Sequence, residues 1–159
     1  MDEKSCDTRC PISTSLGLLV LRVAAGASLA INHGWVKFHD PDFKSKFFGM
    51  VGGMGLPASN ALAWAAIAAE LVGGVLLALG FLTRVSAFMI LCVMGVAIWK
   101  IHLPSHQGFA GMEMAVLYGG IAVAFLFGGA GRISVDGMLF CRGKKSETTS
   151  ESDEPVEKF

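Results

Sequence analysis

Ionisable side chains are rare inside the long apolar stretches of this 159-residue chain, and their positions mark where chemistry could take place. A charged group within a membrane helix is expensive, so such residues usually face the interior of a bundle and belong to a functional or structural polar site. The candidates for polar sites are therefore Arg22, His33, Lys37, Glu70, Arg84, His102 and Glu113.

Two histidines and one glutamate form the first predicted group. His33, His102 and Glu113 belong to three different apolar stretches and lie near the same predicted side of the membrane. Imidazoles and a carboxylate are common zinc and transition-metal ligands, so these residues are weak candidates for a metal site. They could equally hydrogen-bond the carbonyls of a quinone and pass protons, or merely cap helix ends and meet water.

Arg22 and Glu70 form the second predicted group. On ideal helices their depths differ by about 9 Å, which a long arginine side chain can largely span. We expect a structural ion pair or a hydrogen-bonded strut between them. The alternative is a carboxylate that carries protons or contacts a substrate headgroup. Arg84 is expected at the same side of the membrane as Arg22, and Lys37 at the opposite side.

The four cysteines contain no C-x-x-C motif. Cys92 lies in the middle of an apolar stretch and is expected to fill space. Cys6, Cys10 and Cys141 are predicted on the cytoplasmic side, where disulfides rarely persist. A thiol pair, a weak metal site, acylation and an incidental role remain open for them, and an inverted topology would allow a disulfide between Cys6 and Cys10.

The elements that must position these residues are four apolar stretches. Hydrophobic residues make up 53% of the chain and charged residues only 16%, against about 25% charged residues in a typical globular protein. About 20 apolar residues cross a membrane as a helix, and residues 16–34, 60–82, 85–103 and 111–129 approach or reach this length. The predicted fold is all-α: a polytopic membrane protein with four transmembrane helices in an antiparallel bundle.

Polar segments flank and interrupt this predicted bundle. Between the first two helices, Phe43, Phe47 and Phe48 alternate with Lys44 and Lys46, which predicts an interfacial amphipathic segment. Residues 1–15 are expected to form a polar tail that contains cysteines, and residues 16–136 the membrane domain. Residues 137–159 are predicted to form a polar, disordered tail, whose stretch from Lys145 to Phe159 is rich in Ser, Thr, Glu and Lys.

The basic residues near the helix ends predict the orientation in the membrane. Seven lie on the side of the two tails and four on the opposite side, so both termini are expected to face the cytoplasm.

The formal net charge is zero and there is no nucleic-acid-binding motif, so nucleic acid is excluded as an expected partner. Small residues spaced by four, such as Gly120, Ala124 and Gly128, favour close helix packing and allow a homo-oligomer.

Together, these residues resemble the DoxX family of small bacterial and archaeal membrane proteins. The resemblance extends from about Leu16 to Asp136, and several weak motifs in a fixed order carry it. They are Arg22-x-x-x-Gly26, His33-Gly34-x-x-Lys37-Phe38, Glu70-Leu71-x-Gly73-Gly74, Gly80-x-x-Thr83-Arg84, His102, Gly111-x-Glu113 and Gly129-x-Gly131-Arg132-x-Ser134-x-Asp136.

The resemblance implies a four-helix protein of the cytoplasmic (inner) membrane. Family members resemble subunits of quinol- or thiosulfate:quinone-linked enzymes, and others are linked to responses to oxidative stress. The sequence carries no flavin, nucleotide, haem or iron–sulfur motif. The expected function is therefore an accessory, quinone-facing subunit of a membrane redox system that needs a redox partner protein. The alternatives are a small-solute or metal transporter and a scaffold that recruits a partner.

Overall fold

The computed structural model describes residues 12–105, 108–131 and 133–138, and the regular elements among them are all helical. The first helix runs without a break through α1 (Ile12–Leu29), a π-helical segment η1 (Ala30–Trp35) and α2 (Val36–His39). The others are α3 (Pro41–Gly53), α4 (Ser59–Leu79), α5 (Thr83–Ala97) with its π-helical end η2 (Ile98–His102), and α6 (Gly108–Gly128). The predicted all-α class is confirmed.

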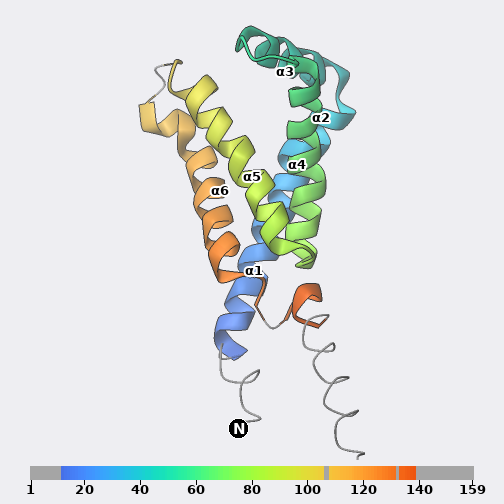
Figure 1. Ribbon diagram of the computed structural model, residues 1–159, viewed down its shortest axis with the longest axis vertical. Helices are drawn as coiled ribbons and strands as arrows, with labels where there is room; N and C mark the ends of the chain where they lie inside the picture. The colour runs from blue at the N-terminus through green and yellow to red at the C-terminus, as the bar shows by residue number, and fades with distance from the viewer. Residues whose placement is uncertain (1–11, 106–107, 132, 139–159) are drawn as a thin grey trace, which may run out of the picture.

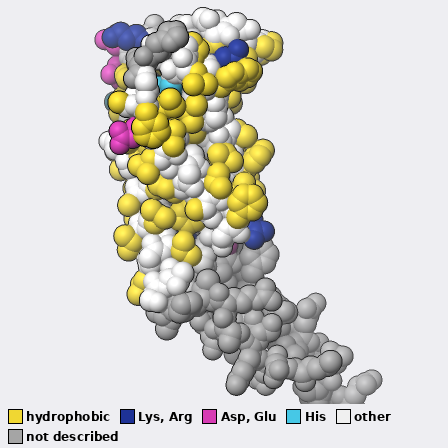
Figure 2. Space-filling view, turned by 90° about the vertical axis from the view of Figure 1, so that its left-hand side faces the viewer, with side chains coloured by type: hydrophobic (Ala, Val, Ile, Leu, Met, Phe, Trp, Pro, Cys, Tyr) yellow, Lys and Arg dark blue, Asp and Glu magenta, His cyan; other side chains and the backbone are white. Residues whose placement is uncertain are grey.

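Four helices are long and apolar enough to cross a membrane: Ser13–His39, Ser59–Leu79, Thr83–His102 and Gly108–Gly128. On the face shown in Figure 2, hydrophobic side chains cover the middle of the helices, and charged groups gather toward the upper end, with a further basic group at the right-hand edge beside the grey residues. Large apolar side chains such as Val20, Trp99 and Phe127 are more than 60% exposed, as expected for contact with lipid. The four predicted spans are confirmed, and the first continues five residues beyond its predicted end at Gly34.

The helices form two arms that diverge toward one end of the molecule (Figure 1). One arm consists of α5 and α6, which pack along each other, and the other contains η1, α2, α3 and α4. The arms meet where α4 and α6 end and α5 begins, beside α1 (Figure 1). Two separate groups of buried apolar residues result: one joins α1, α4, α5 and α6, and the other joins α3 to the first half of α4.

The contact between α1 and α4 depends on glycine. A Cβ atom on Gly26 would lie 2.5 Å from the carbonyl oxygen of Gly74, and one on Gly34 would lie 2.5 Å from the backbone nitrogen of Leu71. Neither contact leaves room for a side chain, so these glycines allow the two backbones to approach closely, as is common in membrane bundles. This approach brings the polar residues of the first helix beside those of α4.

The predicted amphipathic segment forms α3. Asp40 caps this helix, because its Oδ1 accepts hydrogen bonds from the backbone N–H groups of Asp42 and Phe43 at 2.9 and 3.3 Å. Phe47 and Val51 are buried against Ala63 and Ile67 of α4. The helix therefore covers the outer end of one arm. The predicted tails, with Cys6, Cys10 and Cys141, lie almost entirely outside the described residues.

Candidate functional site

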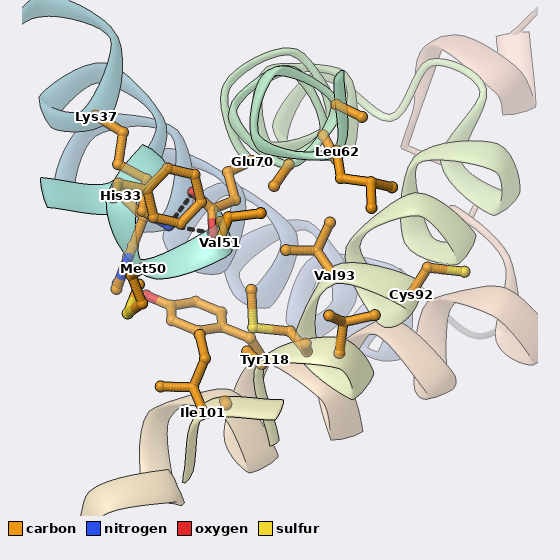
Figure 3. A pocket seen from close by; sticks show the side chains of 18 of the residues that line it. His33, Lys37, Met50, Val51, Leu62, Glu70, Cys92, Val93, Ile101 and Tyr118 are labelled. Atoms are coloured by element: carbon orange, nitrogen blue, oxygen red, sulfur yellow. Dashed lines mark hydrogen bonds and ion pairs between the residues drawn. The ribbon is translucent and has the colours of Figure 1, made fainter. Parts of the chain in front are cut away.

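A cavity of about 770 Å³ lies between the two arms, on the side of the molecule that α3 covers. Its walls come from η1, α2, α3, α4, α5, η2 and α6 and are mostly apolar (Figure 3). Methionine is prominent among them, and its flexible, polarizable side chain adapts to irregular apolar ligands. The methionines that line the cavity are Met50, Met54, Met89, Met94 and Met114.

A buried ion pair forms one polar part of this cavity. The Nζ atom of Lys37 lies 2.7 and 2.6 Å from the two carboxylate oxygens of Glu70, and the side chains are 14% and 3% exposed. The Phe47 ring of α3 covers the ammonium group, with its centroid 4.5 Å from Nζ. Such a cation–π contact is worth about 2 kcal/mol or more where water is excluded. The pair therefore joins the first helix, α3 and α4 beside the cavity.

His33 and Tyr118 form a second polar part of the cavity wall (Figure 3). Their rings meet edge to face with centroids 5.6 Å apart. The Tyr118 hydroxyl donates a hydrogen bond of 2.9 Å to Oγ of Ser28, which also accepts one of 3.2 Å from Nδ2 of Asn32. Tyr118 is thereby held in place while its hydroxyl oxygen keeps acceptor capacity. The sequence analysis missed this residue, although a lone tyrosine within an apolar helix was the signal.

Both histidines of the cavity belong to π-helical segments. His33 lies within η1 and His102 at the end of η2, and Nδ1 of His102 is buried without a hydrogen-bond partner among the described residues. A π-turn accommodates one extra residue in a helix and is frequent at functional sites, because it redirects a few side chains without changing the register on either side. The two π-turns thus supply the imidazoles on opposite arms of the cavity.

The predicted pair of Arg22 and Glu70 is wrong. The guanidinium group of Arg22 donates hydrogen bonds to three backbone carbonyls: 3.3 Å to Ala78, 2.6 Å to Ala130 and 2.8 Å to Ile133. The physical reason is that the first helix extends to Lys37, whose ammonium group reaches the carboxylate. Arg22 is 1% exposed, and its five N–H donors suit several carbonyls better than a single distant carboxylate.

Asp136 completes the polar contacts around Arg22. Its carboxylate accepts hydrogen bonds from the backbone N–H groups of Leu82 and Thr83 at 2.8 and 2.9 Å, where α5 begins. Burial alone would raise the pKa of Asp136, but these bonds and the positive charge of Arg22 outweigh it, so the pKa lies below its ordinary value. Arg22 and Asp136, with their backbone partners, form what we call the clamped end of the bundle.

The structure does not bring the predicted metal ligands together. His33 and His102 both line the cavity, whereas Glu113 is exposed on α6 and is absent from its walls. Among the described residues, no three His, Cys, Asp or Glu side chains lie close enough to hold a metal ion. The two imidazoles are kept apart because η1 and η2 belong to different arms, which diverge. Each π-turn directs its histidine into the cavity from its own side.

The remaining candidates fall into two classes. Lys37 and Glu70 line the cavity. Together with His33, His102 and Tyr118 they form a group of polar residues that we call the pocket end of the bundle. Arg84 is exposed beside the clamped end, and Cys92 lines the cavity from α5. An apolar chamber with hydrogen-bonding groups on part of its wall suits a lipid-soluble ring that carries carbonyl or hydroxyl groups. The donor set therefore fits the quinone expected from the sequence.

Comparison with known proteins places this arrangement in a family. The model of the DoxX family matches residues 17–103. An uncharacterized protein of Haemophilus influenzae is 32% identical over 128 residues, which cover 77% of this chain and 90% of that protein. A Bacillus subtilis protein with the name "Putative oxidoreductase CatD" is 32% identical over 139 residues, which cover 87% of this chain and 97% of that protein. No solved structure matches. The family model and the four membrane-spanning helices agree: the chain is a membrane protein of the DoxX family.

Proposed function

We propose that this protein is an accessory subunit of a membrane redox system and that its cavity holds a quinone. The observation that carries the proposal is the composition of the cavity: apolar, methionine-rich walls with His33, Tyr118, His102 and the Lys37–Glu70 pair at the pocket end. The name "Putative oxidoreductase CatD" of the Bacillus subtilis relative supports a redox role. The expected location is the cytoplasmic membrane, with both termini on the cytoplasmic side.

The residues of the pocket end have distinct roles in this proposal. His33 and His102 would donate hydrogen bonds to the ring oxygens of the quinone, and the Tyr118 hydroxyl would lie beside them. Lys37 and Glu70 would keep the wall polar and would hold a proton close to the ring oxygens. When bound, a quinone supplies the capacity to accept or release electrons together with protons. The electrons would come from or go to a partner protein that carries its own redox centre.

The core between the two ends argues against a path for polar solutes. The buried side chains there include Leu77, Ile90 and Phe125, which are at most 2% exposed. A solute path would need polar groups at several successive depths, and a buried polar group without a partner is costly. Binding of an apolar molecule at one end accounts for the arrangement of these residues better than transport from one side to the other.

Direct binding of a quinone tests the proposal. The purified protein in mild detergent is titrated with a short-tailed ubiquinone analogue by calorimetry, and thermal unfolding is followed in parallel. Ligand at 100 times its Kd should stabilise the folded state by about 2.7 kcal/mol. His33→Ala and His102→Ala should each weaken binding about tenfold, or about 1.4 kcal/mol, because each removes a donor to a ring oxygen.

Glu113→Gln is the matched control, because Glu113 is exposed and does not line the cavity. It should bind the quinone like the wild type. Unchanged binding in both pocket variants, or no binding by the folded wild-type protein, would contradict the proposed function.

A further inference from the structure

The cavity is bordered on one side by apolar residues that are also exposed. Leu62 of α4 and Phe88, Cys92 and Val96 of α5 line the cavity, and all four are classed as exposed. We call these four residues the lateral mouth. In Figure 3, Leu62 and Cys92 lie on the opposite side of the cavity from His33 and Tyr118. The cavity therefore has a polar side within the bundle and an apolar side between α4 and α5. Exposed residues of α3, among them Lys46 and Met50, also border it at the end that α3 covers.

The lateral mouth lies within the membrane-spanning segments. Leu62 belongs to the span Ser59–Leu79, and the other three residues belong to the span Thr83–His102. Cys92 is the tenth residue of this 20-residue span, so it is expected near the middle of the hydrocarbon core. Leu62, the fourth residue of its span, lies closer to the membrane surface. The part of the mouth at Cys92 is therefore expected to face lipid tails, which favours an apolar molecule over a charged solute.

The volume of the cavity limits how much of a ligand can lie inside. A cavity of about 770 Å³ is in the range that encloses a drug-sized molecule. A quinone ring and the first part of its tail fit this description, whereas the rest of a long polyisoprenoid tail has to continue outside. The lateral mouth provides an apolar exit, because its four side chains carry no ionisable group other than the thiol of Cys92.

On the basis of the proposed function, we infer that the quinone enters from the bilayer, ring first, between α4 and α5. Its ring reaches the pocket end and its tail remains in the lateral mouth, in contact with Cys92 and with lipid. The source of the ligand is thus the membrane and not the aqueous phase. The inference adds an entry route and a tail site to the cavity, and it makes Cys92 a native reporter for both.

Maleimide labelling of Cys92 in lipid vesicles tests this inference. Cys6→Ser, Cys10→Ser and Cys141→Ser leave Cys92 as the reactive thiol. The thiol adds across the maleimide double bond, so that a C–S bond forms and the thiol proton moves to the neighbouring carbon. A lipid-soluble phenylmaleimide should label Cys92 at least ten times faster than a sulfonated, membrane-impermeant maleimide present on both sides of the bilayer. A long-tailed ubiquinone should slow the lipid-soluble reagent at least fivefold.

A second reporter controls for general effects of the quinone on the bilayer. Val72→Cys, combined with Cys92→Ser, places a thiol on the exposed face of α4 outside the cavity walls. It should react with the lipid-soluble reagent and should receive no protection from quinone. Calorimetry on the same proteins reports whether the quinone is bound at all.

The possible outcomes separate the inference from the proposed function. Equally fast labelling of Cys92 by the sulfonated reagent would show access from water and would overturn the entry route. Full calorimetric binding without protection of Cys92 would overturn the tail site, although the quinone still binds. The absence of binding by calorimetry would overturn the proposed function and the inference together. Selective protection of Cys92 supports both.

Discussion

The two polar regions of the bundle satisfy their charged groups in opposite ways. At the clamped end, Arg22 and Asp136 bond almost wholly to backbone groups: three carbonyls for the guanidinium and two N–H groups for the carboxylate. These partners hold the start of α5 and the segment after α6 against α1 and α4. The charged groups of this end are thus satisfied within the protein, although the buried hydroxyls of Ser15 and Thr83 beside them have no hydrogen-bond partner among the described residues.

At the pocket end, the charged groups bond to side chains and line a cavity. Lys37 and Glu70 pair with each other, and Tyr118 bonds to Ser28. Nδ1 of His102 has no partner among the described residues. A buried polar group without a partner costs about 1–3 kcal/mol. His102, unlike Ser15 and Thr83, lines the large cavity, so a ligand bound there would supply its partner. The comparison teaches that buried charge can serve the fold at one end of a small bundle and a ligand at the other.

The largest expected effect is the loss of the arginine at the clamped end. Arg22→Ala removes the donors of three carbonyls, and each buried group left unsatisfied costs about 1–3 kcal/mol. We expect a loss of on the order of 3 kcal/mol or more in the free energy of unfolding, measured by denaturant titration in detergent. Arg84→Ala, at an exposed arginine near the same end, should leave it unchanged. Equal stability of the Arg22→Ala and Arg84→Ala variants would contradict the structural role of the clamped end.

A smaller loss of stability is expected when the ion pair of the pocket end is broken from one side. Glu70→Gln leaves the ammonium group of Lys37 without its counter-ion. Because Lys37 is partly exposed, we expect about 2 kcal/mol, below the range for fully buried pairs. Replacing both residues, as Lys37→Met with Glu70→Leu, should restore most of the stability but not the binding of quinone. If the double variant binds quinone normally, the Lys37–Glu70 pair stabilises the fold and has no role in binding.

A deletion sharpens the role of the π-turn at the pocket end. Removal of Ile31, a 61% exposed residue of η1, should convert the π-turn to a regular α-helix. Arg22 and Lys37 lie on either side of the turn and should keep their registers, so unfolding should change by no more than about 1 kcal/mol. His33 should rotate away from the cavity, and quinone affinity should fall about tenfold. Val72 is also exposed but lies within the regular helix α4, so its deletion should unfold the protein. A mild effect of the Val72 deletion would contradict the idea that only the π-turn tolerates the loss of a residue.

The smallest expected effect concerns the pH dependence of the clamped end. The pKa of Asp136 is lower in the folded protein than in the unfolded chain, so its contribution is complete above the unfolded pKa and disappears as the pH falls through the folded pKa. Asp136→Asn should cost about 1 kcal/mol at neutral pH, as for the loss of a helix N-cap. The difference between wild type and variant should shrink at acidic pH, as thermal unfolding measured in a pH series would show. A difference independent of pH would contradict the role of the carboxylate.

The sequence predicted the four membrane helices well because length and hydropathy alone decide them. The sequence did not predict that Lys37 is the partner of Glu70. The apolar stretch appeared to end at Gly34, whereas the helix continues through η1 to Lys37. The acceptors of Arg22 were not predictable, because they are backbone carbonyls, which every residue carries. The cavity depends on the divergence of two arms, and periodicity within single helices contains no information about that.

Similar reasons explain the other differences at the candidate site. His33 and His102 were correctly placed toward one end, but the π-turns that direct them are not visible in a hydropathy pattern. Glu113 is predicted at the same depth in the membrane as these histidines, yet it lies on the exposed side of α6. Depth along a helix can be read from spacing, whereas direction around the helix depends on its neighbours.

The hydrogen bonds of Arg22 have a consequence for biosynthesis. Two of its acceptors, Ala130 and Ile133, follow it by 108 and 111 residues. At about 5–20 residues per second, the ribosome needs roughly 5–20 s to synthesise them after Arg22. Until then the first helix carries a charged side chain that lacks two of its three final acceptors. The full set of hydrogen bonds at Arg22 therefore forms only after the fourth helix has been synthesised, although α4, which carries the acceptor Ala78, is available much earlier.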